Sequence, residues 1–92
     1  MFVILVIKKN GQIQKFNLDK VRLSIERASD EAKTPLTASD INYVSKVIVK
    51  KLESIYLSPL QSNTIHKIVV KSLKDTGFKK VADYYKNYKT KT

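Results

Sequence analysis

An apolar, β-branched run that ends near an Asn-Gly pair constrains this chain more than any other feature. The run Phe2–Ile7 has the composition of a buried strand, and Asn10-Gly11 is the dipeptide that best accepts the positive φ of a two-residue turn. Ile13 and Phe16 continue the apolar pattern after the turn. The stretch Phe2–Lys20 therefore predicts a β-hairpin that leads directly into a helix.

Two amphipathic helices are predicted after the hairpin. The first begins at Asn17, whose side chain suits an N-cap, and is broken at Lys33–Pro35. The second begins at Thr37–Asp40, where a hydroxyl followed three residues later by an acid predicts a capping box. Apolar residues recur at helical spacing in both helices: Leu18, Val21, Ile25, Ala28 and Ala32 in the first, and Ile41, Val44, Ile48, Leu52 and Ile55 in the second, where Val47 and Val49 widen the stripe.

The second half of the chain predicts a short edge strand and two more helices. The strand is expected at Tyr56–Leu60, and Gln61–Thr64 offer capping groups for the third helix. Gly77 followed by Phe78 has the pattern of a Schellman helix end. The fourth helix is expected over about Lys79–Lys89. The inward positions are Ile65, Ile68, Val69, Ser72 and Leu73 in the third helix and Val81, Ala82, Tyr85 and Tyr88 in the fourth.

These elements predict one α+β domain over residues 1–92, because a chain of 92 residues holds a single core. The sequence contains no cysteine, which excludes disulfides, thiolate zinc sites and a cysteine nucleophile. The N-terminal apolar run is about six residues long, far shorter than a membrane span. We therefore expect a cytoplasmic protein with no membrane partner.

The charge balance favours an anionic partner. Eighteen basic residues oppose eight acidic ones, for a net charge of +10, and Arg22 and Arg27 are the only arginines. Lysine suits phosphate neutralisation, whereas bidentate reading of base edges usually recruits arginine, so the composition disfavours nucleic acid as a sequence-specific partner. The alternative is that the lysines only form a solvated surface.

Candidate binding groups gather in the hairpin. Lys8 and Lys9 precede the turn, and Gln14, Asn17 and Lys20 follow it. Ammonium groups suit phosphates and amides suit a purine edge, so this mixture suits a nucleotide, although a plain polar turn would have the same residues. His66 is the only histidine and lies at the expected start of the third helix; without partner ligands it predicts no metal site, and no residue pattern predicts a catalytic centre.

Three stretches fall in one familiar order and spacing. They are VIKKNGQIQKFNLDKV, then SNTIHKIVVKSL with Gly77 after it, then VADYYKNYK. Through these stretches the chain resembles the ATP-cone, and the resemblance covers nearly its whole length. The ATP-cone is a regulatory nucleotide-binding module found at the N-terminus of many ribonucleotide reductases and beside a zinc ribbon in the bacterial repressor of reductase genes. The resemblance implies a small β-sheet lid over four helices, with ATP or dATP between them and magnesium on the phosphates.

The resemblance also implies a set of nucleotide-binding residues. These are Val6 near the base, Lys8 and Lys9 on the triphosphate, Gln14 and Asn17 facing the adenine, Lys20 beside them, Ser62, Ile65 and His66 from the third helix, and Lys89 on a phosphate. Lys9 stands where the family usually has arginine, and Gln14 where an acid is common. Lysine keeps the charge without the bidentate fork, and glutamine still accepts a hydrogen bond from the adenine amino group.

The implied function is allosteric regulation without catalysis. A module of this kind binds ATP or dATP reversibly and controls the activity or assembly of a ribonucleotide reductase, so the expected partners are the reductase core or other copies of the module. One alternative is a basic module that binds nucleic acid through its net charge. Another is an interaction domain whose nucleotide site has decayed.

Overall fold

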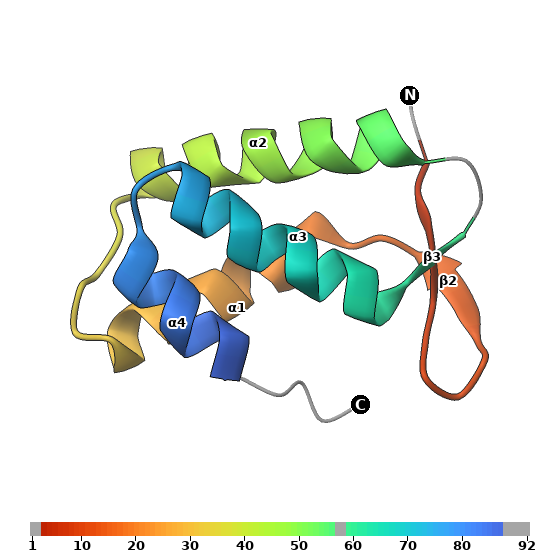
Figure 1. Ribbon diagram of the computed structural model, residues 1–92, viewed down its shortest axis with the longest axis horizontal. Coiled ribbons are helices and arrows are strands. Elements are labelled where there is room, and N and C mark those ends of the chain that lie inside the picture. The colour runs from red at the N-terminus through yellow and green to blue at the C-terminus, as the bar shows by residue number, and fades with distance from the viewer. Residues whose placement is uncertain (1–2, 57–58, 88–92) are drawn as a thin grey trace.

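The computed structural model describes residues 3–56 and 59–87, which form a small sheet at one end of a cluster of helices (Figure 1). In chain order the elements are β1 (Leu5–Ile7), β2 (Ile13–Lys15), α1 (Leu18–Glu31), α2 (Ala38–Ile55), β3 (Leu60–Gln61), α3 (Ser62–Asp75) and α4 (Lys79–Asn87). The three strands lie in the order β2-β1-β3. The predicted α+β class, with a sheet packed on four helices, is confirmed.

The hairpin loop contains three residues rather than the predicted two. The N–H of Lys8 donates to the carbonyl of Gln12 (2.8 Å) and the N–H of Gly11 donates to the carbonyl of Lys8 (2.9 Å), so Lys9, Asn10 and Gly11 form the loop. Gly11 has a φ of 87°, as the last residue of such loops requires, whereas Asn10 keeps a negative φ. Asn10 instead accepts a hydrogen bond from the N–H of Gln12 through Oδ1 (3.0 Å).

β1 is the central strand of the sheet and is shorter than the predicted run Phe2–Ile7. Phe2 lies outside the described residues, and the ladder begins at Leu5. Ile4 and Val6 are buried, whereas Val3 is 50% exposed. One face of the strand is therefore turned toward the helices, as the pleat of a strand allows.

The predicted edge strand is present and pairs with β1, but it spans Leu60–Gln61 and not Tyr56–Leu60. β3 runs parallel to β1, with Val6 opposite Leu60, whereas β2 runs antiparallel to it. Tyr56 lies before the strand and contacts β1 through its side chain, since its hydroxyl accepts a hydrogen bond from the N–H of Leu5 (3.2 Å). Ser58, which the predicted strand included, is outside the described residues.

The ends of three helices follow the predicted chemistry. Oδ1 of Asn17 accepts from the N–H groups of Asp19 (3.0 Å) and Lys20 (3.3 Å) at the start of α1. Thr37 and Asp40 form both hydrogen bonds of a capping box at the start of α2. At the end of α3, Gly77 (φ 95°) and the next residue donate to the carbonyls of Lys74 and Leu73, which is the Schellman pattern.

One hydrophobic core joins the helices to the sheet. α3 packs between α2 and α4, and α1 packs against both α2 and α4. Ile55 departs from its predicted inward position and is 45% exposed, because Leu52, one turn earlier, is the last buried residue of α2. Val47 and Val49 are half-buried. Tyr88 lies outside the described residues, and the core consists of Ile4, Val6, Ile25, Ala28, Ala32, Val44, Ile48, Leu52, Ile65, Val69, Val70, Leu73, Val81, Ala82 and Tyr85.

A left-handed lysine ends α1 without any sequence signal. The N–H groups of Lys33 and Thr34 donate to the carbonyls of Asp30 and Ser29 (both 3.1 Å), which is again a Schellman pattern, and Lys33 has a φ of 57°. For a residue with a Cβ, the left-handed conformation costs about 1–2 kcal/mol of free energy. Glycine avoids this steric cost but loses about 0.5–1 kcal/mol more conformational entropy on folding.

We expect Lys33→Gly to stabilise the domain. The difference between the two costs should raise the free energy of unfolding by about 0.5–1 kcal/mol, which corresponds to a rise in Tm of about 2–8 °C. Thermal denaturation followed by circular dichroism measures this change. Lys33→Ala is the matched control, because it removes the same charge but keeps a Cβ at the strained position. Equal melting temperatures for the two variants would contradict the explanation.

Candidate nucleotide-binding site

An open cavity of about 180 Å³ lies where the sheet meets α1 and α3. Its lining residues are Val6, Lys8, Gln14, Lys15, Phe16, Asn17, Lys20, Val21, Ser24, Ser62, Ile65, His66 and Tyr85. Pockets that enclose a whole drug-sized ligand have about 300–1,000 Å³. The cavity therefore has room for one flat group, with the rest of a larger ligand across its open rim.

The sheet supplies one wall of the cavity through the register of its hairpin. Val6 and Gln14 are directly opposite each other in the β1–β2 pair, so their side chains share a face of the sheet. Phe16, two residues after Gln14, follows the same alternation. Lys8 ends the hairpin ladder and is half-buried. This wall therefore combines apolar surface, one amide and one ammonium group.

The first turns of α1 supply the opposite wall. Lys20 and Val21 lie in the first turn of the helix, and Ser24 lies one turn after them, four residues from Lys20 and three from Val21. Because Oδ1 of Asn17 already accepts the capping hydrogen bonds, its amide NH₂ group is the part available to donate to a ligand. The Ser24 hydroxyl donates to the carbonyl of Lys20 (2.9 Å).

The start of α3 closes the cavity. The predicted capping by Gln61–Thr64 is not found in the described part of the chain, since the N-cap is Gln61 and its side chain makes no capping hydrogen bond. The helix instead begins directly after β3, at Ser62, which places His66 in the second turn rather than the first. The imidazole ring stacks on Tyr85 of α4, with 5.1 Å between ring centroids and 26° between planes. This stacking fixes the orientation of the His66 ring at the cavity wall.

Most of the predicted site residues lie together around this cavity. Val6, Lys8, Gln14, Asn17, Lys20, Ser62, Ile65 and His66 all line it. Lys9 does not, because it occupies the exposed hairpin loop, one residue beyond the end of the ladder. Lys89 lies outside the described residues.

Five lining residues were not in the predicted set: Lys15, Phe16, Val21, Ser24 and Tyr85. A spacing of four residues from Asn17 and from Lys20 could have indicated Val21 and Ser24, and strand alternation from Gln14 could have indicated Phe16. Lys15 alternates to the other side of the strand, so no periodic signal indicates it. Tyr85 was predicted to face inward, and it is buried at 4% exposure.

The electrostatics of the cavity favour an anion with an apolar part. Lys8, Lys15 and Lys20 surround it together with His66, and among the residues described no aspartate or glutamate lines it. Val6 and Ile65 are buried and give the cavity an apolar floor. Such a site can hold a flat heterocycle against apolar side chains, bond its edge through amides and neutralise phosphates with ammonium groups.

The fold and the cavity define a small α+β module with a cationic binding cavity between a sheet and a helix cluster. The chain belongs to the ATP cone domain family, whose model matches residues 4–92. Family membership implies regulation through nucleotide binding.

The chain is also similar to curated transcriptional repressors. It is 25% identical over 89 residues to the transcriptional repressor NrdR of Bacillus cytotoxicus, with 94% of this chain and 57% of the relative covered. It is 28% identical over 89 residues to the transcriptional repressor NrdR of Caulobacter vibrioides, with 94% and 55% covered. The chain therefore spans just over half the length of these relatives.

The described helices do not meet the requirements of a membrane span. None of those in residues 3–56 and 59–87 combines the length and the apolar character needed to cross a membrane.

Proposed function

We propose that this module binds ATP or dATP reversibly in the cavity between the sheet, α1 and α3, and acts as a nucleotide sensor. The observation that carries the proposal is the convergence of Lys8, Gln14, Asn17 and Lys20 with His66 around one cavity with an apolar floor. Four of these residues lie in the stretch from β1 to α1, whereas His66 comes from α3, so the fold and not local sequence brings His66 to the others.

The adenine would occupy the enclosed part of the cavity. Val6 and Ile65 provide apolar contacts for a ring, while the Gln14 side chain can accept from an adenine amino group and the Asn17 amide can donate to a ring nitrogen. Guanine presents a carbonyl where adenine presents that amino group, so Gln14 would have to reverse its amide. This pairing favours adenine over guanine.

The triphosphate would extend over the open rim. Lys8 and Lys20 line this cavity, and His66 adds a ring nitrogen near the sugar and phosphates. Lys9 and Lys89 are further phosphate ligands in the proposal. Magnesium would be bound by the phosphates, which are the usual ligands of this ion in nucleotide sites.

Regulation requires that ATP and dATP favour different states of the protein to which the module belongs. Control of a ribonucleotide reductase, assembly with other copies and a cytoplasmic location are predictions from the resemblance. The relatives are named as transcriptional repressors. The prediction that nucleic acid is disfavoured as a partner therefore finds no support among them. Transcription is as good a candidate as reductase activity for the process that the module regulates.

Isothermal titration calorimetry with ATP, dATP and GTP in the presence of magnesium tests the nucleotide proposal. We expect micromolar dissociation constants for ATP and dATP, equivalent to about −8 kcal/mol, and binding of GTP weaker by roughly tenfold. The tenfold ratio corresponds to about 1.4 kcal/mol, the scale of one net hydrogen bond. No heat of binding with either adenine nucleotide, or equal affinity for GTP, would contradict the proposal.

A further inference from the structure

A second cationic groove lies between α3 and α4 and shares His66 with the nucleotide cavity. It has a volume of about 340 Å³ and is lined by His66, Lys67, Val70, Lys71, Lys74, Asp75 and Lys86. The four lysines are all exposed. The α3–α4 groove therefore presents four ammonium groups to solvent within one small area.

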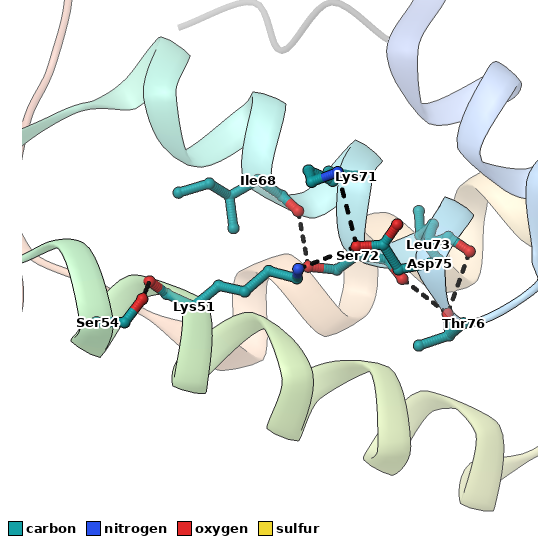
Figure 2. Close-up of polar contacts among 8 residues, drawn as sticks. All are labelled: Lys51, Ser54, Ile68, Lys71, Ser72, Leu73, Asp75 and Thr76. Atoms are coloured by element: carbon teal, nitrogen blue, oxygen red, sulfur yellow. Dashed lines mark hydrogen bonds and ion pairs between the residues drawn. The ribbon is translucent and has the colours of Figure 1, made fainter.

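The only acid lining this groove, in the part of the chain that the structure describes, is already engaged. Figure 2 shows Lys51 reaching from α2 to Asp75 at the end of α3, with 3.0 Å between Nζ and Oδ2, while Lys71 lies 3.9 Å from the same oxygen. The hydrogen bond from Lys51 and the charge of Lys71 hold the pKa of Asp75 below its usual value. Asp75 thus stays ionised, and Lys51 of α2 neutralises much of its negative charge. Asp75 therefore cancels only part of the positive charge of the lysines in the groove.

The lysines of the groove form a row on one helix. Lys67, Lys71 and Lys74 are four and three residues apart, so they share one face of α3. At 1.5 Å per residue, neighbouring lysines of this row are about 4.5–6 Å apart along the helix axis, and their long side chains can reach separate phosphates of one DNA strand. Lys86 adds a charge from α4 on the other side of the groove.

We propose that the α3–α4 groove binds the phosphate backbone of double-stranded DNA without reading its sequence. A row of ammonium groups neutralises successive phosphates and releases their counterions, which gives affinity without base discrimination. The lining residues include no arginine, the side chain that usually reads guanine edges. The groove shares only His66 with the nucleotide cavity, so this proposal does not require the nucleotide to bind.

The groove between α1 and α2 is the rival basic surface. Arg22, Lys46 and Lys50 line it, but the carboxylate of Glu53 lies among them. Like charge repels phosphate, so this groove should contribute less to DNA binding. It also provides Lys46 and Lys50, two of the three lysines of a matched control.

Fluorescence anisotropy with a short labelled DNA duplex of mixed sequence, without nucleotide, tests the proposal. The test variant is Lys67→Gln/Lys74→Gln/Lys86→Gln, which leaves the ion pairs of Asp75 with Lys51 and Lys71 in place. The control is Lys33→Gln/Lys46→Gln/Lys50→Gln, which removes the same charge elsewhere. Thermal denaturation of both variants establishes that they are folded before binding is compared.

The slope of log affinity against log salt, between about 50 and 200 mM, is the decisive quantity. We expect the test variant to lower the magnitude of this slope by about 3, one for each phosphate that the protein no longer neutralises, and the control to lower it by less than about 1. Equal changes in both variants, a larger change in the control, or no binding by the wild type at the lower salt would overturn the proposal. Displacement of the DNA by polyglutamate at equal charge concentration would also overturn it, in favour of an acidic protein partner.

Discussion

Lys8→Ala is expected to weaken ATP binding by roughly 10–100-fold, because a hydrogen bond to a charged group contributes about 1.5–3 kcal/mol. Lys8 is half-buried and lines the cavity, so its ammonium group is held close to any bound phosphate. Lys80 on α4 is exposed and does not line the cavity, so Lys80→Ala should change affinity by less than about twofold at physiological salt, where exposed distant charges are screened.

Lys9→Ala separates the contribution to ATP binding of the lysine in the hairpin loop from that of Lys8, which ends the ladder. The resemblance assigns both lysines to the triphosphate, but Lys9 lies in the exposed loop. We expect an intermediate loss, because an exposed flexible side chain gives up conformational entropy when it binds. Calorimetric titration of the three variants with ATP is the measurement. Equal losses for Lys8, Lys9 and Lys80 would show that the attraction is diffuse and that the cavity is not the phosphate site.

Local chemistry explains why much of the fold could be predicted from the sequence. The Thr37–Asp40 capping box and the Gly77 helix end depend on residues within a few positions of each other, and both are present in the structure. Helical spacing likewise identified the buried faces, as at Ile48 and Leu73. Signals of this kind remain readable because no distant residue is needed to complete them.

The errors arose where the outcome depends on distant residues or on equivalent local choices. The third strand is fixed by its pairing with β1, so the local alternation at Tyr56–Leu60 did not give its bounds. Asn10-Gly11 suits both a two-residue and a three-residue loop, and the ladder beyond it decides between them. Lys33 shows no preference for a left-handed conformation, and the helix end imposes one.

The candidate site could be predicted in outline because several of its residues belong to one continuous stretch. Asn17 caps α1, Lys20 lies in its first turn, and Gln14 is close before them. Ser62 and His66 could be assigned only through the resemblance, since nothing in their own segment shows that α3 starts against the hairpin. The stacking of His66 on Tyr85 depends on the packing of α4 on α3, which the sequence does not specify.

Leu73→Ala is expected to destabilise the domain by about 2–5 kcal/mol, because it removes a fully buried side chain and leaves a cavity. A loss of about 3 kcal/mol corresponds to a fall in Tm of about 12–24 °C for a domain of this size. The control is Leu23→Ala on α1, where the side chain is 48% exposed and the expected change is about 0.5 kcal/mol or less. Thermal denaturation of both variants in the absence of nucleotide gives the comparison.

ATP should restore much of the stability that Leu73→Ala removes, and this links the core to the candidate site. Leu73 lies on α3 but does not line the cavity, so the variant should retain its affinity once folded. A ligand at about 100 times its dissociation constant adds about 2.7 kcal/mol to the free energy of unfolding. The Tm of the variant should therefore rise with ATP concentration, whereas in Leu73→Ala/Lys8→Ala the same concentrations should raise it much less. A Tm that does not respond to ATP in Leu73→Ala, or that rises equally in both variants, would contradict nucleotide binding at Lys8.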